Sequence, residues 1–275
     1  MSIMKKLREY LNRPLSFVMF LLIIISTVIT ALTVVFIIGY IFIKGVPNLS
    51  LDLFSLKYSS SNQSMLPSII NTFYLTALTL LLSVPIGIFS AIYLAEYSRK
   101  NSFFVKIINI ANETLSGIPS IVYGLFGFLA FVISKKWGYS LLAGVITLAI
   151  MVLPLIIRTS QEAMLGVDNT FREASYGLGA GKLRTVFKIV LPSAMPGILS
   201  GIILAIGRIV GETAGTVPEA ATKLTSSSRT ISVHLYCLLN EGLYTEQAYA
   251  TAVVLIVFVV IINALSNALA KKIMK

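Results

Sequence analysis

The sequence predicts an all-α protein, a polytopic membrane helical bundle with six transmembrane helices. Of its 275 residues, 56% are apolar and only 12% are charged, against roughly 45–50% and 25% in soluble domains. The mean hydropathy is +0.89. The apolar residues form long charge-free runs rather than stripes at helical spacing, which is typical of membrane spans. These observations exclude a water-soluble enzyme.

Six charge-free runs are long enough, or nearly long enough, to cross a hydrocarbon core of about 30 Å at about 1.5 Å per residue. They cover residues 15–43, 69–94, 115–134, 141–157, 195–210 and 248–270. The first run is longer than the apolar region of a secretory signal, so we expect it to remain as an anchor. The fourth and fifth runs are short, and neighbouring spans support their assignment. We expect residues 1–275 to form one transmembrane domain.

The basic residues predict the orientation of the chain. With both termini in the cytoplasm, 15 of the 22 basic residues lie on the inner side and 6 on the outer side, and Arg208 lies within a span. This excess is the positive-inside bias of membrane proteins. It accounts for the formal charge of +11 without a nucleic-acid-binding surface, so we expect no nucleic acid as a partner.

Two connections are too long to be simple turns and are the places to look for function. One is cytoplasmic, at about 159–194, and the other is on the outer side, at about 211–247. The outer connection contains an amphipathic stretch at 231–239. Two interpretations stay open: a helix at the membrane surface, or a segment packed on the neighbouring spans.

The cytoplasmic connection carries three alternating glycines, Gly177, Gly179 and Gly181. They would destabilise a continuous helix by about 1 kcal/mol each relative to alanine, so we predict a turn between two short helices. The first is expected at about 160–176, with Ser160 as its N-cap. The second is expected at 182–190, ended by Pro192.

The second short helix has an apolar face rimmed by basic residues. At helical spacing this face comprises Leu183, Val186, Phe187 and Val190, whereas Lys182, Arg184 and Lys188 lie off it. Such a helix either docks a soluble partner or lies on the membrane surface.

The residues of this connection resemble the EAA loop of ABC-importer permeases. The matching positions are Glu173, Ala174, Gly179, Ile189, Leu191 and Pro192. Ser175 replaces the usual alanine, and we expect this small-for-small change to alter the helix surface little. The resemblance implies that the helix after the glycine, with Leu183 and Phe187 on its apolar face, fits a groove on a separate ATP-hydrolysing subunit.

The chain itself offers no nucleotide site. Gly181-Lys182 is the nearest approach to a phosphate-binding P-loop, but Tyr176 and Leu183 occupy the positions that require glycine and Ser or Thr. We find no paired catalytic carboxylates, no nucleophile with its base and no second thiol beside Cys237. His234, the single histidine, is expected to be a loop residue. We therefore expect a non-catalytic protein without cofactor or metal.

Two charges stand near the outer end of the fifth run. Counted from Pro196 on a helix, Arg208 lies about 18 Å along the axis and Glu212 about one turn further. They extend a stripe of small residues that should face protein or a water-filled path, namely Gly197, Gly201 and Ala205. We predict that Arg208 binds an oxyanion. Glu212 is expected to neutralise Arg208 in the empty state and to accept a hydrogen bond from a protonated phosphate oxygen. A purely structural ion pair is the alternative.

These charges lie in a second recognisable pattern. Arg208-x-x-Gly211-Glu212-Thr213-Ala214 resembles a signature of phosphate-importer permeases, as do residues 116–124 and 91–97. The resemblance extends from about residue 65 to the end and departs at 215–219. It implies a substrate-pathway role for Arg208, Glu212 and Thr213. Arg158 matches an arginine at the inner end of the fourth span, where a positive-inside anchor is an equal alternative.

The resemblance implies a type I ABC importer permease of MetI-like fold, in the plasma (inner) membrane of a prokaryote. Such a chain forms half of the translocation pathway of an ATP-driven phosphate importer. The implied partners are two copies of a PstB-like ATP-binding subunit, a second PstC-like permease, a PstS-like phosphate-binding protein, inorganic phosphate and membrane lipid. The PstC-type role and a permease for sulfate or molybdate are alternatives, as are a membrane-embedded enzyme and a structural scaffold.

Overall fold

The computed structural model describes residues 14–59, 62–99, 102–212, 226 and 228–273. Every regular element in this part of the chain is helical, as predicted. The α-helices are α2 (Pro14–Gly45), α3 (Leu66–Ile92), α4 (Phe103–Gly117), α5 (Ser120–Gly127), α6 (Leu141–Leu165), α7 (Asn169–Gly177), α8 (Lys182–Thr185), α9 (Leu191–Gly211), α10 (Ile231–Glu241) and α11 (Thr245–Ile273). The 3₁₀ turns are η1 (Val46–Asn48) and η2 (Leu51–Phe54), and the π-helical turns are η3 (Tyr93–Tyr97), η4 (Phe128–Ser134) and η5 (Val186–Val190).

Five helical stretches are long and apolar enough to cross a membrane. They cover 15–48, 66–97, 141–165, 182–211 and 245–268. A sixth is formed by α4 together with α5 and η4, which meet at an angle of 98°. With the bent pair taken as one span, the helices agree with the predicted six-span membrane bundle.

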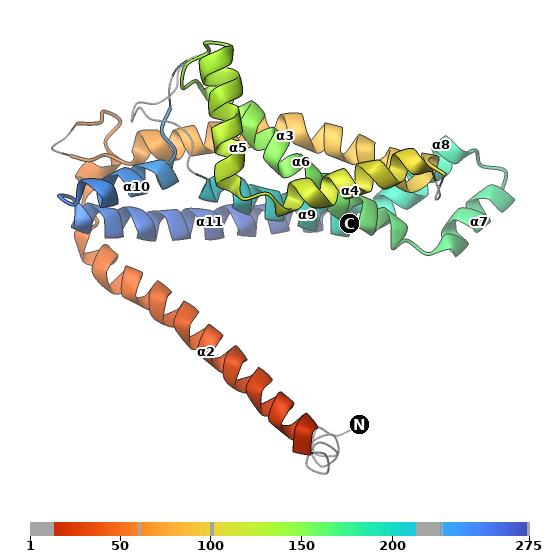
Figure 1. Ribbon diagram of the computed structural model, residues 1–275, viewed down its shortest axis with the longest axis horizontal. Helices are drawn as coiled ribbons and strands as arrows, with labels where there is room; N and C mark the ends of the chain where they lie inside the picture. Colours follow the sequence, from red (N-terminus) through yellow and green to blue (C-terminus); the bar gives the residue numbers. More distant parts are fainter. Residues whose placement is uncertain (1–13, 60–61, 100–101, 213–225, 227, 274–275) are drawn as a thin grey trace.

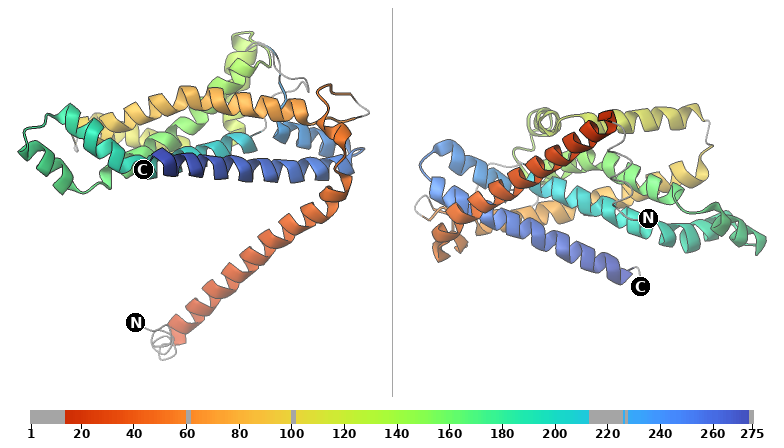
Figure 2. Two further views of the ribbon diagram at one scale, coloured as in Figure 1. Left: turned by 180° about the vertical axis from the view of Figure 1, so that it is seen from behind. Right: turned by 90° about the horizontal axis from the view of Figure 1, so that it is seen from below.

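The bundle is built around α6. Figures 1 and 2 show α3, α6, α9 and α11 running alongside one another, with α7 and α8 projecting at one end and α10 lying at the other. The largest core cluster joins α3, α5, α6 and α9 and includes Val152, Ile156 and Ile209, which are fully or almost fully buried. Burial of such side chains stabilises the packing by about 1.5–3 kcal/mol each in water, and in a bilayer close packing takes over that role.

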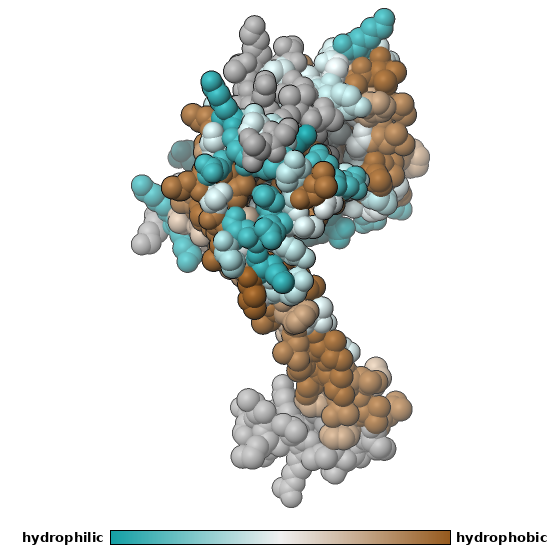
Figure 3. All heavy atoms as spheres, turned by 90° about the vertical axis from the view of Figure 1, so that its left-hand side faces the viewer, coloured by the Kyte–Doolittle hydropathy of each residue, from teal (hydrophilic) through white to brown (hydrophobic). Residues whose placement is uncertain are grey.

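Helix α2 diverges from the bundle at the end that carries α10 (Figures 1 and 2). There Gly45 lies so close to Tyr249 and Val253 of α11 that a Cβ would collide with them. Figure 3 shows hydrophilic side chains gathered on this end of the bundle, whereas α2 projects as a hydrophobic column. The apolar exterior of α2 fits a helix surrounded by lipid.

The structure divides the predicted span 115–134. Helix α4 ends at Gly117, Ile118 is extended (φ −71°, ψ 129°), and α5 begins after Pro119. A residue before proline avoids the helical region, which explains the break. The Tyr123 hydroxyl donates a hydrogen bond of 2.8 Å to the Leu115 carbonyl oxygen across the bend.

Two boundaries of the predicted cytoplasmic helices are wrong. Helix α6 continues to Leu165, so Ser160 lies buried inside it and caps nothing. Asp168 is the N-cap of α7 instead: its Oδ1 accepts hydrogen bonds from the Thr170 backbone N–H (2.9 Å) and hydroxyl (2.8 Å), and these bonds lower the pKa of Asp168. Pro192 does not end the second helix, because α8, the π-helical turn η5 and α9 form one continuous helical stretch that passes through it.

Candidate transport and docking sites

The loop between α6 and α9, residues 166–190, turns at Gly179 as the glycine spacing predicts. Gly179 has φ +79°, a backbone conformation that favours glycine. Its N–H donates to the Tyr176 carbonyl (2.9 Å), and the Ala180 N–H donates to the Ser175 carbonyl (3.1 Å). These two bonds form the Schellman motif that closes a helix C-terminus. The turn therefore separates α7 from α8 with a defined geometry.

The hydroxyl group of Ser175 forms a contact that an alanine at this position could not form. The Ser175 side chain is buried, and its Oγ lies 2.8 Å from Oγ1 of Thr185. This hydrogen bond joins α7 to α8 across the turn. The expectation that serine in place of alanine alters little concerned the helix surface and is not contradicted, because Ser175 is buried; beneath that surface its hydroxyl cross-links the two short helices.

The predicted apolar face after the turn is divided between two environments. Val186 and Val190 are fully buried in a cluster with Met164 and Ile198. Leu183 and Phe187 are 67% and 39% exposed. The four residues therefore do not form one exposed ridge: half of the face packs into the bundle and half is open.

Five large apolar side chains of the 166–190 loop are exposed, and we call them the loop surface: Phe171, Tyr176, Leu178, Leu183 and Phe187. Leu178 is 90% exposed. Sequence reasoning missed Leu178, although a leucine between turn glycines was a visible signal. Exposed apolar groups clustered on one projection are typical of a protein–protein contact.

The remaining EAA positions differ in their exposure. Glu173 and Ala174 are exposed on α7, Ile189 and Leu191 are half-buried, and Pro192 is exposed. Glu173 and Ala174 thus lie on the projecting α7, whereas Ile189, Leu191 and Pro192 lie where η5 leads into the bundle helix α9.

The small-residue stripe of α9 faces protein, as predicted. A Cβ at Gly197 would approach the Ala163 side chain to 2.6 Å, and one at Gly201 would collide with Thr159. Ala205 is fully buried in the core cluster. Helix α9 thus packs closely against α6 up to the turn that carries Arg208.

Arg208 and Glu212 do not form the expected ion pair. Helix α9 ends at Gly211, and Glu212 is extended (φ −79°, ψ 148°), so the helical phase assumed for Glu212 is wrong. Within the described residues the ion pairs are Arg158–Glu162 and Arg172–Glu96, and no carboxylate lies within 4.0 Å of the half-buried Arg208. Arg208 therefore keeps its hydrogen-bond donors for another acceptor.

A pocket of about 140 Å³ lies between α5 and the N-terminal half of α6, and Glu212 is among its lining residues. Tyr123, Tyr139 and Thr147 are among its lining residues. The pocket thus brings a carboxylate together with hydroxyl groups, and one of these hydroxyls, that of Tyr123, lies within electrostatic reach of Arg208.

Helix α10 corresponds to the amphipathic stretch 231–239 and packs on neighbouring helices. The Ser232 hydroxyl donates to the Val210 carbonyl (2.6 Å), one of the carbonyls left open at the C-terminus of α9. The Ile231 N–H donates to Oγ1 of Thr72 in α3 (2.9 Å). Helix α10 thereby fixes the end of α9 that carries Arg208.

Arg158 lies apart from this region. It forms an i,i+4 ion pair of 2.9 Å with Glu162, and both side chains are more than half exposed. Its neighbours are Asn109 and Glu113 of α4, in a separate surface hollow. Thr213 lies outside the described residues.

His234 is fully buried in α10, which corrects its expected place in a loop. Its Nε2 lies 3.2 Å from the Gln63 carbonyl oxygen, and its Nδ1 has no hydrogen-bond partner in the part of the chain that the structure describes. Burial, reinforced by the positive charge of Arg229, lowers the pKa of His234 to about 4.

We expect the protein to become less stable as the pH falls from about 6.5 toward 4. In this range an unfolded histidine binds a proton that buried His234 excludes, which reduces the free energy of unfolding by about 1.4 kcal/mol per pH unit. Thermal unfolding of the detergent-solubilised protein at several pH values measures this loss. His234→Gln should show a shallower dependence than the wild type. Equal slopes for the two proteins would contradict the assignment.

The fold and these two regions define a multi-pass helical membrane protein of the transporter-permease class. The model of the family "Binding-protein-dependent transport system inner membrane component" matches residues 83–275. The chain belongs to this family, as its EAA loop predicts. It is an ABC importer permease.

Individual relatives agree with this assignment. The probable ABC transporter permease protein YqgI of Bacillus subtilis is 31% identical over 249 residues, covering 82% of this chain and 84% of that protein. The phosphate transport system permease protein PstA of Haemophilus influenzae is 35% identical over 212 residues, covering 76% and 74%. A chain of the MetNI methionine ABC transporter in an inward-facing conformation superposes with a TM-score of 0.60 at 17% identity, covering 77% and 94%. This likeness confirms the predicted fold.

Proposed function

We propose that this protein is the PstA-type permease of an ATP-driven phosphate importer and forms half of its translocation pathway. The observation that carries the proposal is Arg208, a guanidinium in a spanning helix with no carboxylate within 4.0 Å among the described residues. Charged residues inside membrane-spanning helices are energetically costly and usually have a function. The planar fork of donors on the Arg208 guanidinium matches a tetrahedral oxyanion. The PstA relatives support phosphate as that anion.

The loop surface is the proposed contact with a separate ATPase subunit. Leu183 and Phe187 would insert into a groove of that subunit, with Glu173, Ala174 and Gly179 shaping the helix pair that presents them. Two copies of a PstB-like ATPase, a PstC-like second permease and a PstS-like phosphate-binding protein would complete the importer. Both chain termini would lie in the cytoplasm, on the side of the loop surface. ATP binding would then change the side to which the pathway opens.

Competition experiments test the substrate. Cells that lack other phosphate importers and express the complete set of subunits should accumulate labelled phosphate. A hundredfold excess of unlabelled phosphate should abolish this uptake, whereas the same excess of sulfate or molybdate should leave it unchanged. Inhibition by sulfate or molybdate alone would identify a permease for another oxyanion.

Complementation separates the two permease roles. The chain should restore phosphate uptake to a strain that lacks its PstA-type permease and fail in a strain that lacks the PstC-type permease. The reverse pattern would assign the PstC role.

A further inference from the structure

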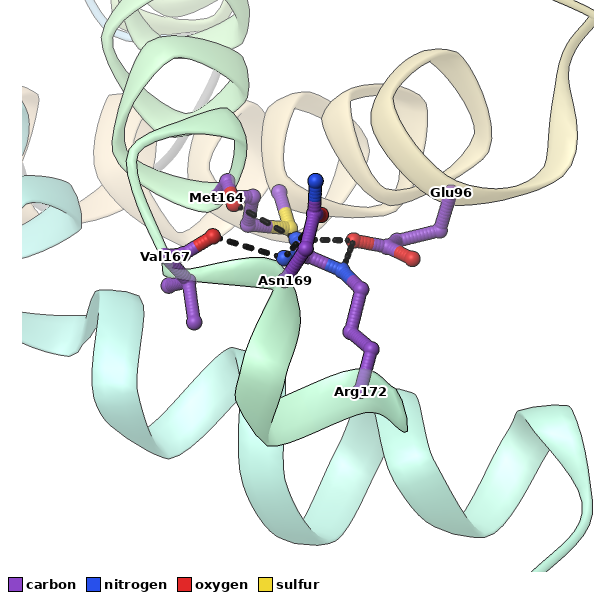
Figure 4. A network of polar contacts seen from close by, with 5 residues as sticks. All are labelled: Glu96, Met164, Val167, Asn169 and Arg172. Carbon is purple, nitrogen blue, oxygen red and sulfur yellow. Dashed lines mark hydrogen bonds and ion pairs between the residues drawn. The ribbon is translucent and has the colours of Figure 1, made fainter. Parts of the chain in front are cut away.

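The 166–190 loop is fastened to the inner end of α3 by a buried ion pair, Arg172–Glu96. Figure 4 shows Arg172 reaching from α7 toward Glu96, with the end of α6 beside it. Nη2 and Nε of Arg172 lie 2.7 Å and 3.1 Å from Oε1 of Glu96. The two side chains are only 13% and 6% exposed. The ion pair joins residues 76 positions apart in the chain.

Every N–H group of the Arg172 guanidinium has a hydrogen-bond acceptor. Besides its two bonds to Glu96, Nη2 donates to the Met164 carbonyl (2.8 Å), and Nη1 donates to the Val167 carbonyl (2.7 Å) and to Oδ1 of Asn169 (3.3 Å). Five N–H donors therefore meet five acceptor contacts, the maximum that arginine offers. Lysine has three donors and no fork, so it cannot reproduce this arrangement.

The ion pair joins elements that the backbone does not join. Helix α6 leads directly into the loop, and α8 continues through η5 into α9. Helix α3 has no such connection, because its chain runs on to α4. Glu96 lies in η3, the last turn of the α3 span, and the neighbouring Tyr97 ring is covered by Lys182 Nζ at 4.9 Å. Side chains therefore provide the attachment of α3 to the loop.

We propose that Arg172 and Glu96 are positioning residues that make α3 move together with the loop when the ATPase subunit displaces it. This inference rests on the proposed function. A displaced loop moves α6 and α9 because the backbone connects them to it. Helix α3 has no such connection, so it follows the loop through the ion pair between Glu96 and the Arg172 guanidinium. Because removal of either partner leaves the other charge buried, the two residues should act as one unit.

The complete importer in proteoliposomes tests this role through the number of ATP molecules hydrolysed per phosphate imported. Glu96→Gln and Arg172→Gln should each raise this number about tenfold, since coupling free energies of this kind are worth about 5- to 150-fold. The double variant should be no worse than either single variant. Glu162→Gln, which breaks an ion pair with both side chains more than half exposed, is the matched control and should leave the number unchanged.

The outcomes separate this inference from the proposed function. A wild-type importer that does not transport phosphate would overturn the proposed function. If the wild-type importer transports phosphate and the variants hydrolyse the same number of ATP molecules per phosphate as the wild type, the positioning role would be overturned. Variants whose uptake and ATP hydrolysis fall in parallel would show a structural role only. Additive effects in the double variant would show that the residues do not act as a unit.

Discussion

Arg208→Ala is expected to lower phosphate uptake by about 100-fold while the importer still assembles. A hydrogen bond to a charged group contributes about 1.5–3 kcal/mol, and a guanidinium forms two to one oxyanion. Loss of about 3 kcal/mol corresponds to about 100-fold. Initial rates of labelled phosphate uptake, normalised to the amount of permease in the membrane, measure the effect.

Two further variants make the result specific. Arg208→Lys keeps the charge but removes the fork, so its uptake should lie between those of the wild type and Arg208→Ala. Arg99→Ala removes an exposed arginine between η3 and α4 and serves as the control for loss of a positive charge. Full uptake by Arg208→Ala would exclude Arg208 as the anion ligand and favour a structural role for it.

Leu183→Glu is expected to separate the permease from its ATPase subunit. Leu183 is 67% exposed, so the substitution leaves the packing of the bundle intact. A charge placed in a desolvated contact weakens binding by about 2 kcal/mol or more, which is about 30-fold. Co-purification of the ATPase subunit, together with phosphate uptake, measures the loss.

A leucine outside the loop surface provides the matched control. Leu165, at the end of α6, is 52% exposed, and Leu165→Glu should retain both the ATPase subunit and uptake. Gly179→Glu should weaken docking as well, because a side chain at φ +79° strains the Schellman turn that orients α8. Normal uptake with Leu183→Glu and Gly179→Glu combined would contradict docking through this surface.

The spans were predictable because lipid demands long charge-free runs, and these runs are visible in the sequence. The residues at which the spans begin and end were less predictable. Charges bounded the predicted spans, yet α4 contains Lys106 and Glu113, and α6 continues past Arg158. Charged residues in the end turns of a helix reach the interface, so a charge does not mark where a helix stops.

The candidate sites were predicted in part. The glycine turn and the position of Arg208 followed from local chemistry. The separation of Glu212 from Arg208 depends on where α9 ends, and the Arg172–Glu96 pair depends on folding that brings α7 against α3. A single sequence holds no signal for such long-range contacts, and periodicity alone did not reveal which half of the 182–190 face packs inside.

The unbroken helical path from α8 through η5 into α9 has a mechanical consequence. Leu183 and Arg208 lie on one continuous helical stretch, 182–211, and at about 1.5 Å per residue they are roughly 38 Å apart along its axis. If this stretch pivots near one end, a tilt of about 5° sweeps the other end sideways by about 3 Å, roughly the length of a hydrogen bond. If the proposed docking and anion site are correct, a small push on the loop surface would be amplified into a shift of the guanidinium toward an anion or away from it.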